Sequence, residues 1–156
     1  MKTFLSITCF LAFTVIGFAQ QDGFRLGAHG ALPIGKASDV SSFNVGADAS
    51  YLWQVHEIVA IGVATGYSTY LGKKDFDNYS FVPVAFSGRV KQGESLFYTA
   101  DVGYAIALQD GADGGLYYQG KIGWTNSKLD IFIFYKGVSS DGNSLDCIGA
   151  GLAFKI

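Results

Sequence analysis

Apolar and polar residues alternate along most of the chain from residue 24 onward, in stretches separated by segments rich in Gly, Asp, Ser and Asn. A period of two places successive side chains on opposite faces of a β-strand. The pattern predicts eight strands, at residues 24–33, 43–53, 58–71, 81–91, 96–108, 116–125, 129–138 and 145–156. The last strand needs a partner for its free edge, and the first strand is the most economical one. We therefore expect an all-β fold, an eight-stranded antiparallel up-and-down barrel.

The connections between these strands alternate in length. Longer loops follow the first, third, fifth and seventh strands, at residues 35–42, 72–80, 109–115 and 139–144, whereas the other turns have only three or four residues. This alternation is typical of outer-membrane barrels, which have short periplasmic turns and longer external loops. It predicts that both chain termini lie in the periplasm.

One face of each strand is apolar, and the other carries small residues with a few charges. A secreted soluble barrel would also alternate, with the apolar face inside around an apolar ligand. The small face is too sparsely charged for a solvated exterior, but it suits the narrow lumen of eight strands. We therefore expect a transmembrane barrel. In residues 129–138, Phe132 and Phe134 share a face with Asp130 and Lys136, and we assign Leu129, Ile131, Ile133 and Tyr135 outward.

The inward face collects a set of charged side chains. The predicted polar network of the lumen consists of Arg25, His29, Asp48, Arg89, Asp101, Lys121, Asp130 and Lys136. Positive and negative side chains are roughly balanced in this network, and charges in so narrow an interior must pair or be solvated. The sequence favours a self-neutralising plug. The alternative is a narrow porin-like path for ions or small solutes, for which eight strands rarely leave room.

Aromatic residues gather near the strand ends, as in the interfacial girdles of membrane proteins. The predicted girdle has Trp53, Tyr98, Trp124 and Phe154 toward the short turns, and Tyr70, Tyr118 and Tyr135 toward the longer loops.

Composition agrees with an all-β membrane protein. Charged residues make up 15% of the chain, against about 25% in soluble domains. The 21 glycines disfavour helices. A net charge of −2, with no basic cluster beyond Lys73 and Lys74, gives no electrostatic case for binding nucleic acid.

The N-terminus has the features of a secretory signal peptide. Lys2 precedes the apolar run 4–18, and small residues at positions 17 and 19 predict cleavage ahead of Gln20. Residues 1–19 are thus the expected signal peptide and residues 20–156 the barrel domain. Cleavage would leave Cys147 as the single cysteine, so we expect no internal disulfide.

Candidate chemistry is sparse. The chain has two histidines: His29 has no serine in a recognisable nucleophile setting beside it, and His56 falls in a short turn. We predict no enzymatic activity, no metal site and no cofactor. The charged loop 72–80, with Phe76 and Tyr79, is the candidate surface for a ligand.

The final segment Gly151-Leu152-Ala153-Phe154-Lys155-Ile156, with the signal sequence and the eight alternating strands, resembles the small outer-membrane β-barrel proteins of Gram-negative bacteria. The group is the porin-like outer membrane protein beta-barrel domain family common in the Bacteroidota. The resemblance implies that Gly151, Phe154 and Ile156 form the signal read by the barrel-assembly machinery, with Ile at the end where Phe is usual. It covers the whole mature chain and is architectural.

The sequence therefore predicts a monomeric integral outer-membrane barrel with a structural or surface-interaction role, in contact with outer-membrane lipid. A narrow solute channel and a secreted soluble barrel are the alternatives.

Overall fold

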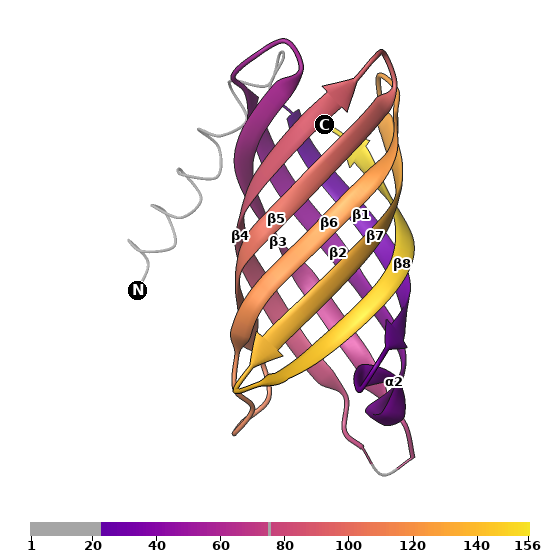
Figure 1. The fold of residues 1–156 in the computed structure, drawn as a ribbon, viewed down its shortest axis with the longest axis vertical. Helices are drawn as coiled ribbons and strands as arrows, with labels where there is room; N and C mark the ends of the chain where they lie inside the picture. The colour runs from indigo at the N-terminus through magenta and orange to yellow at the C-terminus, as the bar shows by residue number, and fades with distance from the viewer. Residues whose placement is uncertain (1–22, 75) are drawn as a thin grey trace, which may run out of the picture.

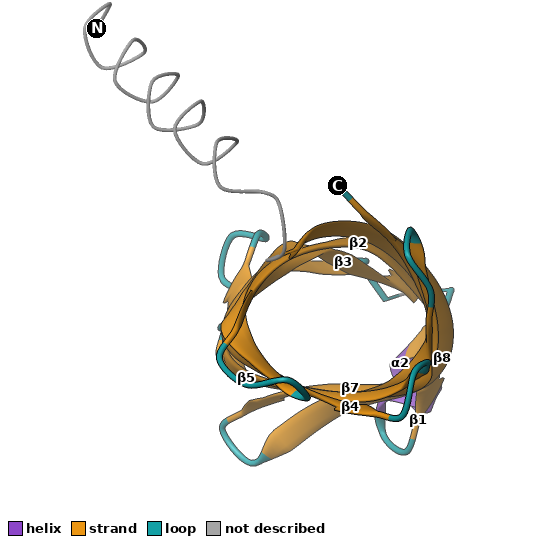
Figure 2. Cartoon of the chain, turned by 90° about the horizontal axis from the view of Figure 1, so that it is seen from above, coloured by secondary structure: helices purple, strands orange, loops and turns teal. Residues whose placement is uncertain are grey.

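The computed structural model describes residues 23–74 and 76–156. In this part of the chain eight strands form one closed antiparallel barrel in which each strand pairs with its neighbours in sequence. Figure 1 shows the tilted strands, and Figure 2 shows the closed ring that they make when viewed along the barrel. The predicted all-β, eight-stranded fold is confirmed. The predicted signal peptide and its cleavage site ahead of Gln20 lie outside the described residues.

The strands have eleven to fourteen residues each, which is enough to cross a bilayer, since a tilted strand needs about 9–11. Their bounds are β1 Gly23–Ile34, β2 Ser41–Gln54, β3 Val59–Gly72, β4 Tyr79–Gln92, β5 Leu96–Ala107, β6 Gly115–Thr125, β7 Leu129–Ser140 and β8 Asn143–Lys155. The one helix of the described residues, α2, is the four-residue Ala37–Val40. No helix in the described ranges is long and apolar enough to cross a membrane.

The barrel closes between the first and last strands, as the alternation predicts. β1 and β8 pair over ten residues, from Arg25 opposite Lys155 to Ile34 opposite Asp146. The backbone NH of Ile156 donates to the carbonyl of Phe24 and extends this seam to the chain end. Closure leaves no sheet edge exposed.

The two ends of the barrel differ in their connections. The turn end, at the top of Figure 1, has the tight turns 55–58, 93–95 and 126–128, and both Gly23 and Ile156 lie there. The loop end has the connections 35–40, 73–78 and 108–114. The last connection differs from the predicted loop 139–144: it is a two-residue turn, Asp141-Gly142, with φ of 47° and 79°. Positive φ at both central residues is the turn geometry that matches the twist of two paired strands, and Asp-Gly favours it.

The outer wall is apolar on all eight strands. Ile61, Val63, Phe86, Val102 and Ile133 are examples of its exposed side chains. The seventh strand follows the assigned phase, because Ile131, Ile133 and Tyr135 are exposed while its phenylalanines are buried. A solvated barrel would have the reverse arrangement, so this wall is that of a transmembrane barrel.

Candidate functional site: the lumen

The structure places all eight residues of the predicted polar network inside the barrel, at different depths. Three layers can be distinguished along the axis by their contacts. The loop-end layer contains Asn44, Asp48, His29, Ser68 and Lys136. The middle layer contains Ser87, Asp101 and Lys121. The turn-end layer contains Arg25, Arg89, Thr125, Asp130 and Lys155.

The loop-end layer is centred on His29 of β1. Its Nδ1 lies 2.7 Å from an oxygen of Asp48, and its Nε2 lies 2.7 Å from Nζ of Lys136. An ammonium group has no acceptor, so Nε2 must accept and Nδ1 must carry the hydrogen that it donates to Asp48. His29 therefore bridges the carboxylate of Asp48 and the ammonium group of Lys136.

Lys136 is 1% exposed, and it also donates to the hydroxyl of Ser68 at 2.8 Å. The Ser68 hydroxyl accepts a further hydrogen bond from the side-chain amide of Asn44. The single positive charge of this layer is thus matched by the single carboxylate of Asp48.

Aromatic side chains fill the lumen around this layer and on its loop-end side. Tyr70, Phe81 and Tyr117 are at most 2% exposed, and the Phe81 ring lies 6.3 Å and 6.2 Å from the other two ring centroids. The ammonium of Lys136 lies 5.3 Å from the centroid of the Phe134 ring. Tyr70, predicted in the girdle, instead points inward, and its hydroxyl donates to the carbonyl of Leu145. That part of the girdle prediction is wrong, because Tyr70 falls on the lumen phase of β3 beside Ser68.

The middle layer is a compact ion pair. Nζ of Lys121 lies 3.2 Å from one oxygen of Asp101, and the hydroxyl of Ser87 donates to the other at 2.5 Å. The carboxylate is 1% exposed. One cation therefore again meets one anion.

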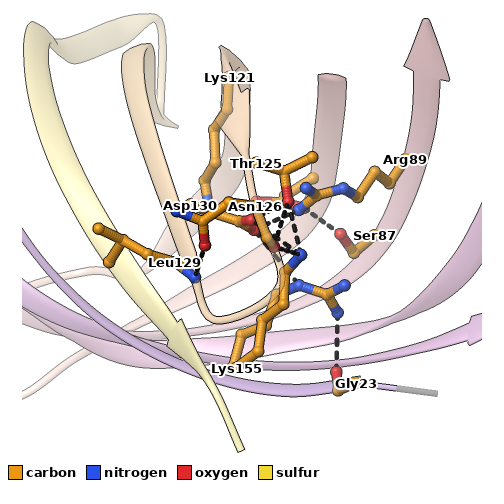
Figure 3. Close-up of polar contacts among 11 residues, drawn as sticks. Gly23, Ser87, Arg89, Lys121, Thr125, Asn126, Leu129, Asp130 and Lys155 are labelled. Carbon is orange, nitrogen blue, oxygen red and sulfur yellow. Dashed lines mark hydrogen bonds and ion pairs between the residues drawn. The ribbon is translucent and has the colours of Figure 1, made fainter. Parts of the chain in front are cut away.

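The turn-end layer is unbalanced. Arg25, Arg89 and Lys155 lie 3.4, 2.6 and 3.5 Å from the carboxylate of Asp130. Figure 3 shows Arg89, Thr125 and Lys155 meeting at Asp130. Three cationic groups thus share one anion. The guanidinium of Arg89 also lies 3.7 Å from the centroid of the Phe97 ring.

The hollows of the lumen adjoin this layer. A cavity of about 30 Å³ lies between the middle and turn-end layers, and its lining includes Arg25, Arg89 and Lys121. A second cavity, of about 50 Å³, opens at the turn end and is lined by Gly23, Arg25, Arg89 and Lys91 among others. Larger apolar hollows, of about 590 and 470 Å³, are lined chiefly by outward-facing residues of the wall, where lipid chains would fill them.

Sequence reasoning missed two parts of this site. Lys155 was not counted in the lumen, although it follows Cys147, Gly149, Gly151 and Ala153 at the same alternation. With Lys155 the lumen holds five cationic side chains and three carboxylates, so the expected balance of sign is wrong. The other omission is the group of aromatic rings that closes the lumen. The alternation places Phe81 and Tyr117 on the inward face, and this could have indicated it.

The remaining sequence candidates lie apart from one another. His56 lies in the turn 55–58, at the turn end, while His29 lies well inside the barrel. Cys147 is buried, with no disulfide, beside Asn44. Among residues 23–74 and 76–156, no three His, Cys, Asp or Glu side chains are grouped to hold a metal ion.

The six other girdle residues lie on the outer wall. Trp53, Tyr98, Trp124 and Phe154 are exposed at the turn end, and Tyr135 is exposed toward the loop end. Tyr118 is half-buried against Tyr135.

The hydroxyl of Tyr118 crosses strand β7 to donate to the carboxylate of Asp146 at 2.6 Å. Gly137 lies between these two residues in register, and a Cβ at this position would meet both of them. The missing side chain of Gly137 is what permits the contact.

The residues proposed as an assembly signal lie on the last strand. Phe154 and Ile156 are exposed on the outer wall, and Gly151 pairs with His29 of β1 and with Phe132 of β7.

Loop 72–80 contributes one freely exposed aromatic ring. Phe76 is 56% exposed. Tyr79, the other expected recognition residue, belongs to β4, packs against Phe81 and donates to the carbonyl of Asp113.

Comparison with known proteins supports the architecture. No protein-family model and no curated protein matches the chain. The attachment invasion locus protein Ail of Yersinia pestis is 10% identical with a TM-score of 0.61, over 86% of this chain and 97% of that one. Neisserial surface protein A is 12% identical with a TM-score of 0.52, over 88% and 98%. The designed barrel TMB2.3 is 15% identical with a TM-score of 0.56, over 88% and 98%. At such low identity the similarity establishes that this chain has the fold of the small transmembrane β-barrels.

Proposed function

We propose that this protein is an integral outer-membrane β-barrel with both termini in the periplasm, serving envelope structure or surface interaction rather than catalysis or transport. The observation that carries the proposal is the pairing of a predominantly apolar outer wall with a packed lumen. An apolar outer wall requires lipid around the barrel. A packed lumen leaves the outer wall and the loops as the surfaces with which the protein can contact other molecules. The alternative of a secreted soluble barrel needs the apolar face inside, opposite to the arrangement found.

The orientation follows from the two ends. Small outer-membrane barrels keep short turns in the periplasm and longer loops outside. Three of the four loop-end connections are longer than any turn-end connection, and both ends of the barrel domain lie at the turn end. This supports a periplasmic turn end and an external loop end.

The closed lumen argues against the porin-like channel. Tyr70, Phe81 and Tyr117 fill the loop-end half, and the two lumen cavities lie on the other side of Lys136 and His29. A conducting path would need these buried rings to move.

The absence of catalysis is proposed from the state of His29. Both of its ring nitrogens are engaged, by Asp48 and by Lys136, and its side chain is 1% exposed. A general base needs a free nitrogen within reach of a substrate proton.

A surface role would use the loop end. Phe76 stands exposed on the connection 73–78, which is anchored because Lys73 donates to the carbonyl of Ser38 at 2.6 Å. Two structural neighbours are an attachment invasion locus protein and a surface protein, which supports a role of this kind. Loop 72–80 is therefore the proposed contact surface.

Membership of the Bacteroidota group and recognition by the barrel-assembly machinery are proposed from the last strand. Gly151 and Phe154 keep the pattern of that group, and Ile156 stands where Phe is usual. With no contact to another copy needed to close the barrel, we propose a monomer.

The proposal is tested by separating inner-membrane, outer-membrane and soluble fractions and running each on a denaturing gel with and without boiling. An outer-membrane band that migrates differently when unboiled is expected of a closed barrel. A soluble protein without this shift would overturn the proposal. In planar bilayers, reproducible ion-selective single-channel steps would instead favour the channel.

A further inference from the structure

The turn-end layer holds more positive charge than its one carboxylate neutralises. In the described part of the chain, Asp130 is the single acidic group within 4.0 Å of Arg25, Arg89 and Lys155. The side chains of Arg25 and Arg89 are 15% and 6% exposed. Buried cations without a counter-charge are costly, because burial removes the water that stabilises them. The layer therefore has the electrostatic character of a site for one further anion.

The arginine geometry leaves donors for such an anion. One Arg25 amine donates to the carbonyl of Gly23 at 2.8 Å, and one Arg89 amine donates to Asp130 at 2.6 Å. Nε of Arg25 is buried and makes no hydrogen bond in the described structure, but it lies 3.4 Å from the carboxylate of Asp130. A guanidinium carries five N–H donors, so the terminal nitrogens of each arginine keep donors that these contacts do not use.

Space for an anion lies beside these groups. The cavity of about 50 Å³ at the turn end is lined by Arg25, Arg89 and Lys91. A single buried water needs about 10–15 Å³ by the same measure, so the cavity holds several waters or one small oxyanion. Its lining also includes Glu57, a residue of the exposed turn 55–58, which opposes anion binding at the entrance but not at the buried arginines.

We propose that the turn end of the barrel binds a small oxyanion of the phosphate or sulfate class, held by Arg25 and Arg89 with Lys91 at the entrance. Planar guanidinium groups suit this class, because they offer paired N–H donors to two oxygens of one anion. The site goes beyond the proposed function and needs only the folded barrel. It faces the periplasm if the proposed orientation holds.

The first test is isothermal titration of the refolded barrel, in a non-ionic detergent free of phosphate and sulfate, with inorganic phosphate at constant ionic strength. Saturable binding is expected, and chloride should not reproduce it. Arg25→Gln should weaken the binding about tenfold or more, because it removes one charged donor and leaves the Arg89–Asp130 pair in place. Lys36→Gln, at the loop end, is the matched loss of one charge and should bind as the unaltered barrel does.

A second variant keeps the proposal falsifiable if Arg25→Gln fails to fold. Asp130→Asn removes the one carboxylate and should tighten phosphate binding, so that phosphate raises the thermal midpoint of this variant more than that of the unaltered barrel. A cluster that is only a structural ion pair would lose stability with no phosphate-dependent recovery, and that result would overturn the proposal. So would equal binding by Arg25→Gln and the unaltered barrel.

A competition experiment distinguishes a free oxyanion from a lipid headgroup as the occupant of the site. Short-chain phosphatidylglycerol, which carries a phosphate diester on a lipid, is added to the phosphate titration. Displacement of phosphate would support the same site with a lipid headgroup as its occupant. Lack of displacement would support a free oxyanion. Asp22→Asn controls for the carboxylate that directly precedes Gly23 in the sequence, and gain of phosphate binding only in that variant would overturn a site for an external anion.

Discussion

The two halves of the lumen are filled by different physical means. In the loop-end half, His29 bridges one lysine and one aspartate, and aromatic rings occupy the remaining volume. In the turn-end half, three cations share Asp130 and cavities remain beside two arginines. The same wall therefore encloses a closed, neutral plug and an open, positively charged mouth. The lumen is therefore sealed by the packing of aromatic rings and not by its ion pairs.

The largest effect is expected where packing seals the barrel. Phe81→Ala should lower the free energy of unfolding by about 3–5 kcal/mol, because it leaves a cavity among buried rings. Urea unfolding in phospholipid vesicles measures this. Phe76→Ala, in the exposed loop, is the control and should change the value by less than about 0.5 kcal/mol. Equal effects of the two variants would show that the rings near Phe81 do not seal the loop-end half.

The second largest effect is expected on the outer wall, which both halves share. Val63→Arg places a charge on the outer face and should cost about 2–4 kcal/mol in a bilayer. Val55→Arg, in an exposed turn, should cost almost nothing. The same unfolding assay applies, and an unchanged stability of Val63→Arg would mean that this face does not meet lipid.

Substitutions of Lys136 and Lys155 compare the balance of charge in the two halves directly. Lys136→Met removes the one cation of a matched layer and should cost about 1.5–3 kcal/mol, the contribution of hydrogen bonds to a charged group. Lys155→Met removes one of three cations around Asp130, and its side chain is 23% exposed, so the cost should be below about 1 kcal/mol. Unfolding of both variants at the same pH tests this order, and the reverse order would contradict the charge assignment of the two layers.

The smallest effect concerns the turn that caps the loop-end half. Gly142→Ala should cost about 1 kcal/mol, because its φ of 79° is unfavourable for a residue with a Cβ. Gly120→Ala serves as the control in thermal unfolding, since a Cβ there meets no atom within 4 Å. It should cause no loss of stability. A neutral Gly142→Ala would indicate that the tight turn relaxes.

Much of the fold could be read from the sequence, because strand alternation is a local property. Strand β7 shows this well: its phase, inferred from Leu129, Ile131 and Ile133, is the one found. Tyr70 shows the limit. Its position near a strand end predicted a place at the membrane interface. The alternation of β3 instead places its ring in the lumen, where its hydroxyl donates to the carbonyl of Leu145.

The alternation of residues assigns each side chain to the lumen or to the outer wall, because a period of two places it on one of two faces. Which lumen side chains contact one another depends on the closed barrel. Arg25, Arg89 and Lys155 come from β1, β4 and β8, and their convergence on Asp130 of β7 depends on strand register and tilt around a closed ring. Register is set by pairing between segments far apart in the chain, and no local pattern records it. The matched charges of one half and the positive excess of the other are therefore properties of the barrel.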